Sequence, residues 1–507
     1  MACVLNFTGY GILYAVSVGQ IPQHFGLLLT ACILAGHGSG YFDAAAIVSS
    51  TLNFPQTRGL ATGLLKSFYG LSGAILTVFY LGFYDGNPLG FVLFLCVGIT
   101  GVGVFVTLFL NNMPASFTAT ESDAEVKTRF RYGGAIVIFT GIYLSFVTIL
   151  QASVTVSDTM SVIFAVLSIV LVGSFVCLPL GTGPFYINID SNEDVNEDSS
   201  SCASGASGGE ESATNPLYVA ESPLEDPLEA STSRQASLDA RDAQDLLASR
   251  QYSAWETIQT LEFWLFLGAL LVTMGAGLAV LGNTKLMIDQ QGLSLDHSKK
   301  AKDILVALLS IMNCFGRLGC GFLSDMLTPR GVARPWFLVV AVSLMLTSQV
   351  ILAFGNLSFC YLGAMLAGAA YGMCWALAAA LTSDLFGTGH FGQNYSLITL
   401  APTGGSLIFN NWLLPHVYES NQVMGPTGIL TCDTGSHCMR AAFLIVAASL
   451  ALALLFSLGL VRNTKTIFSA HHTLAVSQEE INSSAAVGRK VNSRGKGYGD
   501  PLLKSMA

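Results

Sequence analysis

The stretch LGFVLFLCVGITGVGVFVTLFL, residues 89–110, decides the fold class, because it is long, apolar and free of charged side chains. An α-helix needs about 20 apolar residues to cross the hydrocarbon core of a bilayer. A membrane-spanning β-strand instead needs about ten residues that alternate between apolar and polar. Residues 89–110 do not alternate, so they predict a membrane-spanning helix.

Further runs of the same kind lie on both sides and predict an all-α polytopic membrane protein in a lipid bilayer. The 507 residues are 52% hydrophobic and only 11% charged, which is more apolar surface than a soluble fold of this size buries. We expect 12 transmembrane helices, at residues 2–19, 26–50, 60–83, 89–110, 133–151, 160–181, 262–282, 304–323, 335–355, 358–382, 392–414 and 441–461.

Residues 183–255 differ in composition from the rest of the chain. They are rich in Ser, Asp, Glu, Gly and Pro, and hold 14 acidic and 3 basic side chains. The chain's net charge of −9 therefore comes from this segment, and the remainder sums to +2. Such a segment cannot bury a core, so we predict a disordered acidic connector, with a second disordered, basic tail over residues 466–507.

Basic residues predict the orientation, because cytoplasmic loops carry an excess of Lys and Arg. With the connector in the cytoplasm, both termini and residues 325–334 fall on the same side. Most basic residues are then cytoplasmic. The exceptions are Lys285, Lys299, Lys300, Lys302 and Arg440. We expect a multi-pass protein of the plasma membrane or of a vacuole-like membrane.

The run GHGSGYFDAAA, residues 36–46, places an acidic group inside a predicted helix. A carboxylate at that depth costs on the order of 2.5–3.5 kcal/mol, so Asp43 should face a polar cavity or a partner. It either contributes to proton coupling or substrate contact, or makes a structural interhelical hydrogen bond. His37 lies six residues earlier, on another sector of the helix.

A lysine follows in NFPQTRGLATGLLKSFYGLSGAI, residues 53–75. Lys66 lies about two turns into the next predicted helix. It either snorkels to the membrane interface or attracts an anionic substrate into a cavity.

The second half contains a polar cluster in SIMNCFGRLGCGFLSD, residues 310–325. Asn313, Arg317 and Asp325 lie at the inner end of a predicted helix, where charge-assisted contacts between helix ends can form and break. We predict that they latch one conformational state in preference to binding substrate.

Two further runs carry polar or aromatic groups. Tyr371 and Trp375 are one turn apart and share a helix face that either packs or lines a cavity. Pro402 interrupts the eleventh helix, and Asn410 follows on its outer half, as a candidate on the substrate pathway.

The loop TCDTGSHC, residues 431–438, predicts a disulfide between Cys432 and Cys438 on the non-cytoplasmic side. The alternative, a metal site with His437, lacks a fourth ligand. We therefore expect no metal and no cofactor.

Together these runs resemble the nodulin-like branch of the major facilitator superfamily. The likeness rests on GHGSGYFDAAA around Tyr41, on NFPQTRG with GLLKSFYGLSGAI, on NCFGRLGCGFLSD, on DLFGTGHFGQNY and on VRNTK at residues 461–465. Asp43 departs from the resemblance, since plant relatives tend to have Asn there, and it adds a titratable group that favours proton coupling.

The resemblance implies six helices, two additional helices, a central loop and six more helices. Because NFPQTRG follows the fourth helix in similar proteins, we expect this chain to lack two N-terminal helices. The implied parts are an incomplete N-terminal bundle (1–110), two additional helices (111–182), the connector (183–255), a C-terminal six-helix bundle (256–465) and the tail (466–507).

The leading functional hypothesis is a secondary transporter that moves a small solute by alternating access. The chain has no GxxxxGK[ST] or HExxH motif, so neither ATP-driven transport nor an enzyme is expected. Related branches carry small organic anions, and the acidic chain is not expected to bind nucleic acid.

The alternative is a membrane sensor or scaffold that signals through its connector. Arg234 precedes Ser237 as in a kinase site, and Asp242 with Leu246 and Leu247 fits a sorting-adaptor pattern.

Overall fold

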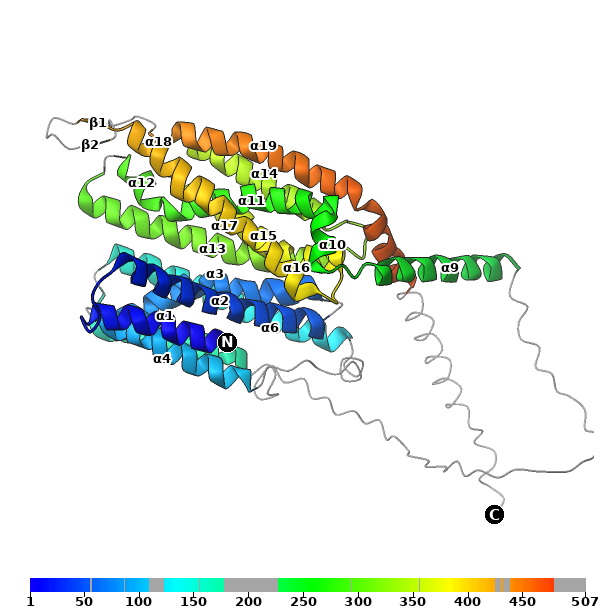
Figure 1. Cartoon of the computed structure of the whole chain (residues 1–507), viewed down its shortest axis with the longest axis horizontal. Helices are drawn as coiled ribbons and strands as arrows, with labels where there is room; N and C mark the ends of the chain where they lie inside the picture. Colours follow the sequence, from blue (N-terminus) through cyan, green and yellow to red (C-terminus); the bar gives the residue numbers. More distant parts are fainter. Residues whose placement is uncertain are drawn as a thin grey trace, which may run out of the picture.

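The computed structural model describes residues 1–54, 57–85, 87–108, 123–154, 156–176, 227–291, 293–354, 356–424, 430–431 and 438–477. These residues form long helices that run side by side, as Figure 1 shows. The predicted all-helical polytopic class is thereby confirmed. The predicted connector and tail lie largely outside these ranges.

The N-terminal half contains two groups of helices. In the first group, α1 (Ala2–Ser17) packs against α2 (Phe25–Asn53) and α4 (Pro88–Thr107). In the second group, α3 (Arg58–Phe83) packs against two helices that follow later in the chain. These are α6 (Asp123–Ser153) and α7 (Asp158–Gly173), which continues into the 3-10 turn η1 (Ser174–Val176).

The C-terminal half is built around two long helices that pack extensively on each other, α13 (Leu295–Leu327) and α15 (Leu357–Phe386). The surrounding helices are α10 (Ala254–Gln259), α11 (Leu261–Gly282), α12 (Thr284–Asp289), α14 (Pro335–Leu352) and α19 (Arg440–Asn463).

The predicted helix at 392–414 is divided into several pieces. They are α16 (Phe391–Ile398), α17 (Leu400–Gly405), the π-helix η2 (Ser406–Leu413) and α18 (Leu414–Ser420). Pro402 lies in α17, where its ring removes a backbone donor and perturbs the regular helix. Beyond α18, β1 (Val423–Met424) pairs antiparallel with β2 (Leu430–Thr431), with Val423 opposite Thr431.

Nine helices in the described part of the chain are long and apolar enough to span a membrane. The helices α1 and α7 are apolar but have 16 residues each, and the divided segment has no single long helix. Within the described residues, each of the predicted runs falls mainly on helical residues, whereas the predicted number of 12 spans stays a prediction.

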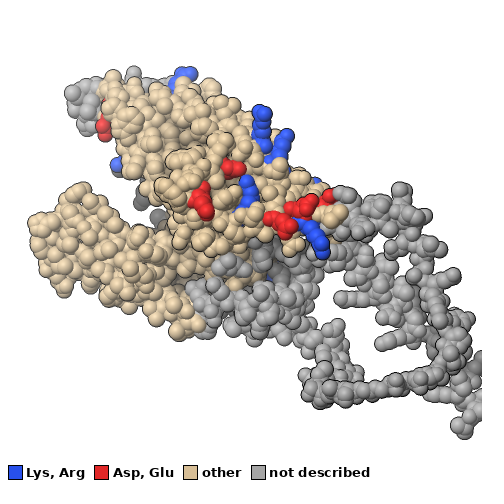
Figure 2. Space-filling view, turned by 45° about the vertical axis from the view of Figure 1, so that its right-hand side comes forward, with Lys and Arg blue, Asp and Glu red and all other residues tan. Residues whose placement is uncertain are grey.

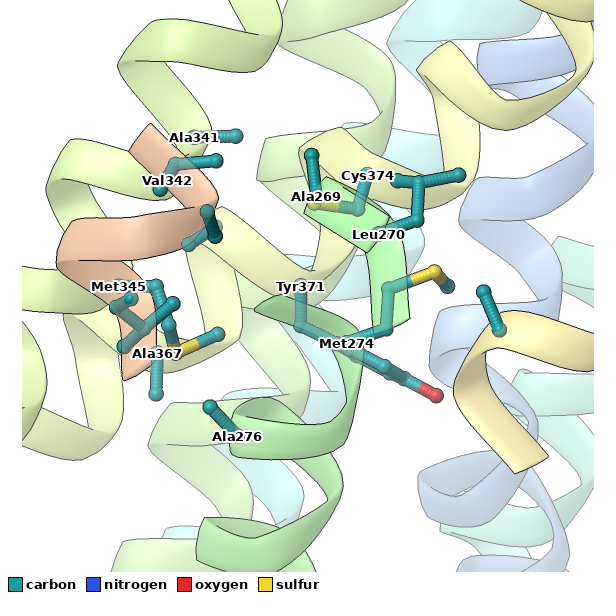
Figure 3. Packing of buried hydrophobic residues seen from close by; sticks show 14 of the residues in the cluster. Ala269, Leu270, Met274, Ala276, Ala341, Val342, Met345, Ala367, Tyr371 and Cys374 are labelled. Carbon is teal, nitrogen blue, oxygen red and sulfur yellow. The ribbon is translucent and has the colours of Figure 1, made fainter. Parts of the chain in front are cut away.

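The core of the C-terminal half combines many alanines, whose small side chains let its helices approach closely, with larger apolar side chains. Ala269 and Met274 of α11 belong to the same cluster as Ala341 and Met345 of α14, and all four side chains are fully buried. Figure 3 shows how these residues and Ala367 of α15 fill the space between the helices.

The two halves are joined mainly through α3, which packs along α13 and also touches α15. The backbones approach so closely that a Cβ added at Gly63 would lie 2.8 Å from the carbonyl oxygen of Arg317. A Cβ at Gly321 would lie 2.4 Å from the carbonyl oxygen of Gly59. Glycine therefore sets the distance between the halves at this contact.

The molecule is hollowed between two lobes. In Figure 2 the lobes diverge at one end and meet at the other, and the charged side chains visible on this face gather on the upper lobe and toward the joined end. Figure 1 places α9 (Pro227–Ser249) and α10 at one end of the bundle, with β1, β2 and α12 at the opposite end.

The C-terminal end of the predicted connector is not disordered as predicted. It forms the helix α9, and the residues that follow α9 are hydrogen-bonded to the C-terminal half. The backbone N–H of Tyr252 donates to the carbonyl of Phe386 at 3.0 Å. The side chain of Gln251 accepts from the N–H of Gly389 at 2.7 Å, and Asn394 donates to the carbonyl of Tyr252 at 2.8 Å. These bonds tie the segment to the turn between α15 and α16. Residues 466–477 of the predicted tail are also helical.

Two glycines of α13 give a matched test of the packing. A Cβ at Gly316 would lie 2.2 Å from the carbonyl oxygen of Ala369, whereas a Cβ at Gly319 would meet nothing within 4 Å. Gly316→Ala should cost roughly 1–3 kcal/mol of stability through overpacking. Gly319→Ala should be neutral or stabilising by up to about 1 kcal/mol, because alanine favours a helix.

Thermal unfolding of the detergent-solubilised chain measures both effects. Equal melting temperatures for the two variants would contradict the close packing of α13 on α15.

Candidate functional site

A cavity of about 350 Å³ lies at α2 and α3, on the side of the N-terminal half that faces the C-terminal half. Its polar lining consists of Ser39, Asp43, Lys66 and Tyr69. The rest of the lining is apolar and is contributed by Phe42, Ala46, Ile47, Leu65 and Phe68.

An ion pair crosses the cavity wall from α2 to α3. The Lys66 ammonium donates to both carboxylate oxygens of Asp43, and each N–O distance is 2.6 Å. The Lys66 side chain is 2% exposed and that of Asp43 is 18% exposed. Each charge offsets the desolvation of the other, and the partial exposure of Asp43 leaves it accessible from the cavity.

Aromatic rings surround the Lys66 ammonium. Its Nζ lies 4.4 Å from the ring centroid of Trp375 on α15, 5.4 Å from that of Tyr69 and 5.7 Å from that of Tyr395 on α16. Rings at these distances stabilise a cation through their quadrupoles. The lysine of the N-terminal half is therefore held by side chains of the C-terminal half.

A second cation lies behind Lys66. Arg317 of α13 is 2% exposed, donates from Nη1 to the carbonyl of Lys66 at 2.7 Å, and donates from Nε to Asn313 at 2.9 Å. Its guanidinium lies 5.7 Å from the ring centroid of Trp375. The predicted latch residues Asn313 and Arg317 are thus neighbours of the predicted pathway residues Lys66 and Trp375.

Two polar groups at this site lack hydrogen bonds. The indole N–H of Trp375 and the hydroxyl of Tyr395 are buried and have no hydrogen-bond partner within the described part of the chain. The Trp375 indole N–H lies near the Tyr371 hydroxyl, and the Tyr395 hydroxyl lies near Asp43, in both cases without reaching hydrogen-bond geometry. Buried polar groups are normally paired, so these two point to a ligand or to a second arrangement of the site.

Tyr371 stands one turn before Trp375 and contacts it edge to face, with ring centroids 6.2 Å apart. Figure 3 shows the Tyr371 hydroxyl pointing away from the labelled alanines of the core.

The other predicted pathway residues lie elsewhere. His37 is exposed and its ring stacks edge-on against Tyr41 at 5.0 Å, outside the cavity lining. Asn410, in η2, accepts a hydrogen bond from Asn283 at 2.9 Å, which joins η2 to the end of α11. Both assignments stay predictions.

Asp325 belongs to a second polar cluster, at the joined end of the bundle. Its carboxylate accepts from the backbone N–H of Gly59 at 3.2 Å and of Leu60 at 2.5 Å, at the start of α3. Arg334 donates to Asp325 at 2.5 Å and also to Asp384 of α15. Burial alone would lower the pKa of Arg334, but the two carboxylates outweigh it and raise that pKa above its usual value. This cluster ties α13, α15 and the loop before α14 to the N-terminal half.

Sequence reasoning missed four residues of these clusters: Tyr69, Tyr395, Arg334 and Asp384. Tyr69 is one turn from Lys66, and this spacing could have indicated it. Nothing in the sequence pairs Arg334 with Asp384, because the pairing depends on the packing of α13, α14 and α15.

The remaining predictions fall partly outside the described residues. Cys432 is not described, whereas Cys438 takes part in a disulfide. The side chains of Arg234 and Ser237 are not described. Leu247 of the sorting pattern packs against the core and Leu246 is 39% exposed.

Comparisons with known proteins give two family matches. Residues 1–180 match the family described as Nodulin-like, and residues 206–410 match the Major Facilitator Superfamily.

Two curated proteins are similar over most of the chain. Protein NUCLEAR FUSION DEFECTIVE 4 of Arabidopsis thaliana is 24% identical over 493 residues, covering 95% of this chain and 79% of that protein. An uncharacterized membrane protein of Saccharomyces cerevisiae is 22% identical over 462 residues, covering 86% of this chain and 78% of that protein.

A solved structure also aligns with the chain. It is a bacterial homolog to the human lysosomal transporter Spinster in an inward-facing and unoccupied conformation, with 16% identity and a TM-score of 0.34, covering 92% of this chain and 96% of that one.

The Asp325 contacts predict the effect of one substitution. Asp325→Asn removes a charge that interacts with the N-terminus of α3, a contact worth about 0.3–2 kcal/mol, and also weakens the Arg334 pair. The two halves should therefore separate more often at this end. Pulsed electron paramagnetic resonance between labels at Thr57 and Arg330 should show longer distances than in the unsubstituted chain.

Asp303→Asn, on the same helix but about 33 Å along it from Asp325, is the control and should leave the distances unchanged. Identical distances for Asp325→Asn would show that this carboxylate does not hold the halves together.

Proposed function

Because the chain belongs to the nodulin-like branch of the major facilitator superfamily, we propose that this membrane transporter carries a small organic anion together with a proton. Membership of the superfamily supports a small-molecule solute and a multi-pass membrane location. Beyond this, we propose that transport occurs by alternating access, that the solute is an organic anion and that a proton is carried with it.

The observation that supports the proposal is the Asp43–Lys66 pair in the wall of the cavity. A cation this deep in a bilayer needs a counter-charge, and Asp43 supplies it. A substrate anion can supply the same charge from within the cavity. Asp43 and the substrate therefore compete for one ammonium group.

Protonation decides this competition. A neutral Asp43 no longer holds Lys66, which is then available to the carboxylate of a substrate. The Tyr395 hydroxyl, which lies nearby without a hydrogen bond, can then pair with the neutral carboxyl group. The anion thus binds more tightly when a proton binds, and this linkage is what coupled transport requires.

The charged and titratable groups that face Asp43 come from three neighbouring elements. They are Lys66 and Tyr69 of α3, Arg317 of α13 and Tyr395 of α16. Lys66 and Arg317 are the two cations among these groups. Replacement of the Lys66 contact by a substrate anion is therefore the event that we propose to favour proton uptake.

Alternating access is supported by the contacts between the halves. The Asp325 cluster and the Gly63 and Gly321 contacts join the halves at one end, while the lobes diverge at the other end. We propose that transport breaks the joined end and closes the open end. We place the joined end and both termini in the cytoplasm, and the protein in the plasma membrane or a vacuole-like membrane.

A second candidate function is a membrane sensor, for which the docking of residues 251–252 on the turn before α16 is the specific observation. A kinase or adaptor acting on the connector would reach α16, and hence Tyr395, through these bonds.

Reconstituted liposomes test the transport proposal. Radiolabelled oxalate, pyruvate and benzoylformate remain ionised and cross bilayers slowly, and protein-free liposomes give the leak. With an acidic exterior, at least one anion should accumulate, because one proton per anion across one pH unit provides about 1.4 kcal/mol and supports about tenfold accumulation.

Asp43→Asn should remove the dependence of uptake on the pH gradient. Asp85→Asn, in the exposed turn between α3 and α4, is the control and should retain it. Uptake by Asp43→Asn that still follows the gradient would show that Asp43 is structural, and uptake no faster than leak for every anion would contradict transport of small anions.

A further inference from the structure

We propose that the substrate is an amphipathic monocarboxylate, with one carboxylate for Lys66 and an apolar body. Its size is up to about fourteen non-hydrogen atoms in all, because a cavity of about 150 Å³ holds the six carbons of benzene. This inference rests on the proposed function and narrows its substrate class. It follows from the charges, the walls and the size of the cavity.

The cavity offers a single cation to a bound molecule. Lys66 lines it, whereas Arg317 is absent from the lining and is engaged behind Lys66 by Asn313 and the Lys66 carbonyl. The second carboxylate of a dianion would therefore lie against apolar walls without a counter-charge. Burial of an unpaired carboxylate is strongly unfavourable, so the cavity selects for one negative charge.

The walls favour an apolar body. Phe42, Ala46, Ile47, Leu65 and Phe68 form the cavity surface beyond the ion pair. The remaining polar lining, Ser39 and Tyr69, supplies only two hydroxyl groups. A sugar would leave most of its hydroxyls unpaired in such a site, whereas an aromatic or branched apolar group would bury its surface against the walls.

The volume sets the size. About 350 Å³ is a little more than twice the roughly 150 Å³ of a cavity that holds one benzene ring, so the cavity has room for benzoate and for somewhat larger monocarboxylates. The unpaired Trp375 indole N–H and Tyr395 hydroxyl lie beside Lys66 and can donate to the same carboxylate. The site thus concentrates its donors at one place and leaves the rest of the cavity apolar.

Four probes separate these features in calorimetric titrations of the purified, detergent-solubilised chain at constant pH. Benzoate has the charge and the ring, benzamide lacks the charge, acetate lacks the ring, and phthalate adds a second carboxylate. Benzoate should bind at least about tenfold more tightly than each of the other three. This ranking requires no variant, so it does not depend on the folding of a substituted chain.

A variant links the ranking to the site. Lys66→Gln should reduce the preference for benzoate over benzamide to about onefold. Lys302→Gln, which removes a surface partner of Asp289, is the control and should keep the preference.

Other outcomes overturn the inference. Phthalate binding as tightly as benzoate would contradict the single charge, and acetate binding as tightly would contradict the apolar body. Failure of benzoate to bind at millimolar concentration would also overturn it. If one of these results is found but oxalate is still taken up along the pH gradient, the proposed transport stands and only the substrate inference fails. If benzoate binds but no anion is taken up, the transport proposal is contradicted and the binding site for a monocarboxylate stands.

Discussion

The structure depends on one constraint, which is that a cation buried in a bilayer must have its charge balanced by nearby groups. Lys66 meets it with the Asp43 carboxylate and with rings from α3, α15 and α16. Because its partners come from both halves, the position of Lys66 reports how the halves are arranged. A change in their relative position therefore alters the balance of charge at the cavity, and a change in charge at the cavity alters their relative position.

The helix α3 contains both the contact that joins the two halves and the buried lysine of the cavity. Its first residues bind Asp325 at the joined end, and Lys66 lies about two turns further along the same helix. The close contacts at Gly63 and Gly321 leave little room for α3 to move relative to α13 without separating at the joined end. We infer that opening of this end and rearrangement of the Lys66 site occur together, which is the relation that the proposed alternating access needs.

Much of the fold followed from the sequence, and much of the site did not. Long apolar runs predicted the helices, because the bilayer sets their length. Asp43 and Lys66 were identified separately by their depth, but periodicity within a helix does not reveal which helices are neighbours, so their pairing was not predicted. Asn313, Arg317 and Asp325 were grouped as one latch, yet eight residues of helix separate Asp325 from Arg317 by about 12 Å. That distance places them in two clusters with different partners.

The most direct test of the central claim is the number of protons taken up when benzoate binds to the purified chain. Titrations in buffers with different ionisation enthalpies give this number. If the substrate carboxylate replaces Asp43 at Lys66, binding near neutral pH should take up close to one proton, and Asp43→Asn should take up none. Tight binding of benzoate without proton uptake by the unsubstituted chain would contradict the claim that Asp43 and the substrate compete for Lys66.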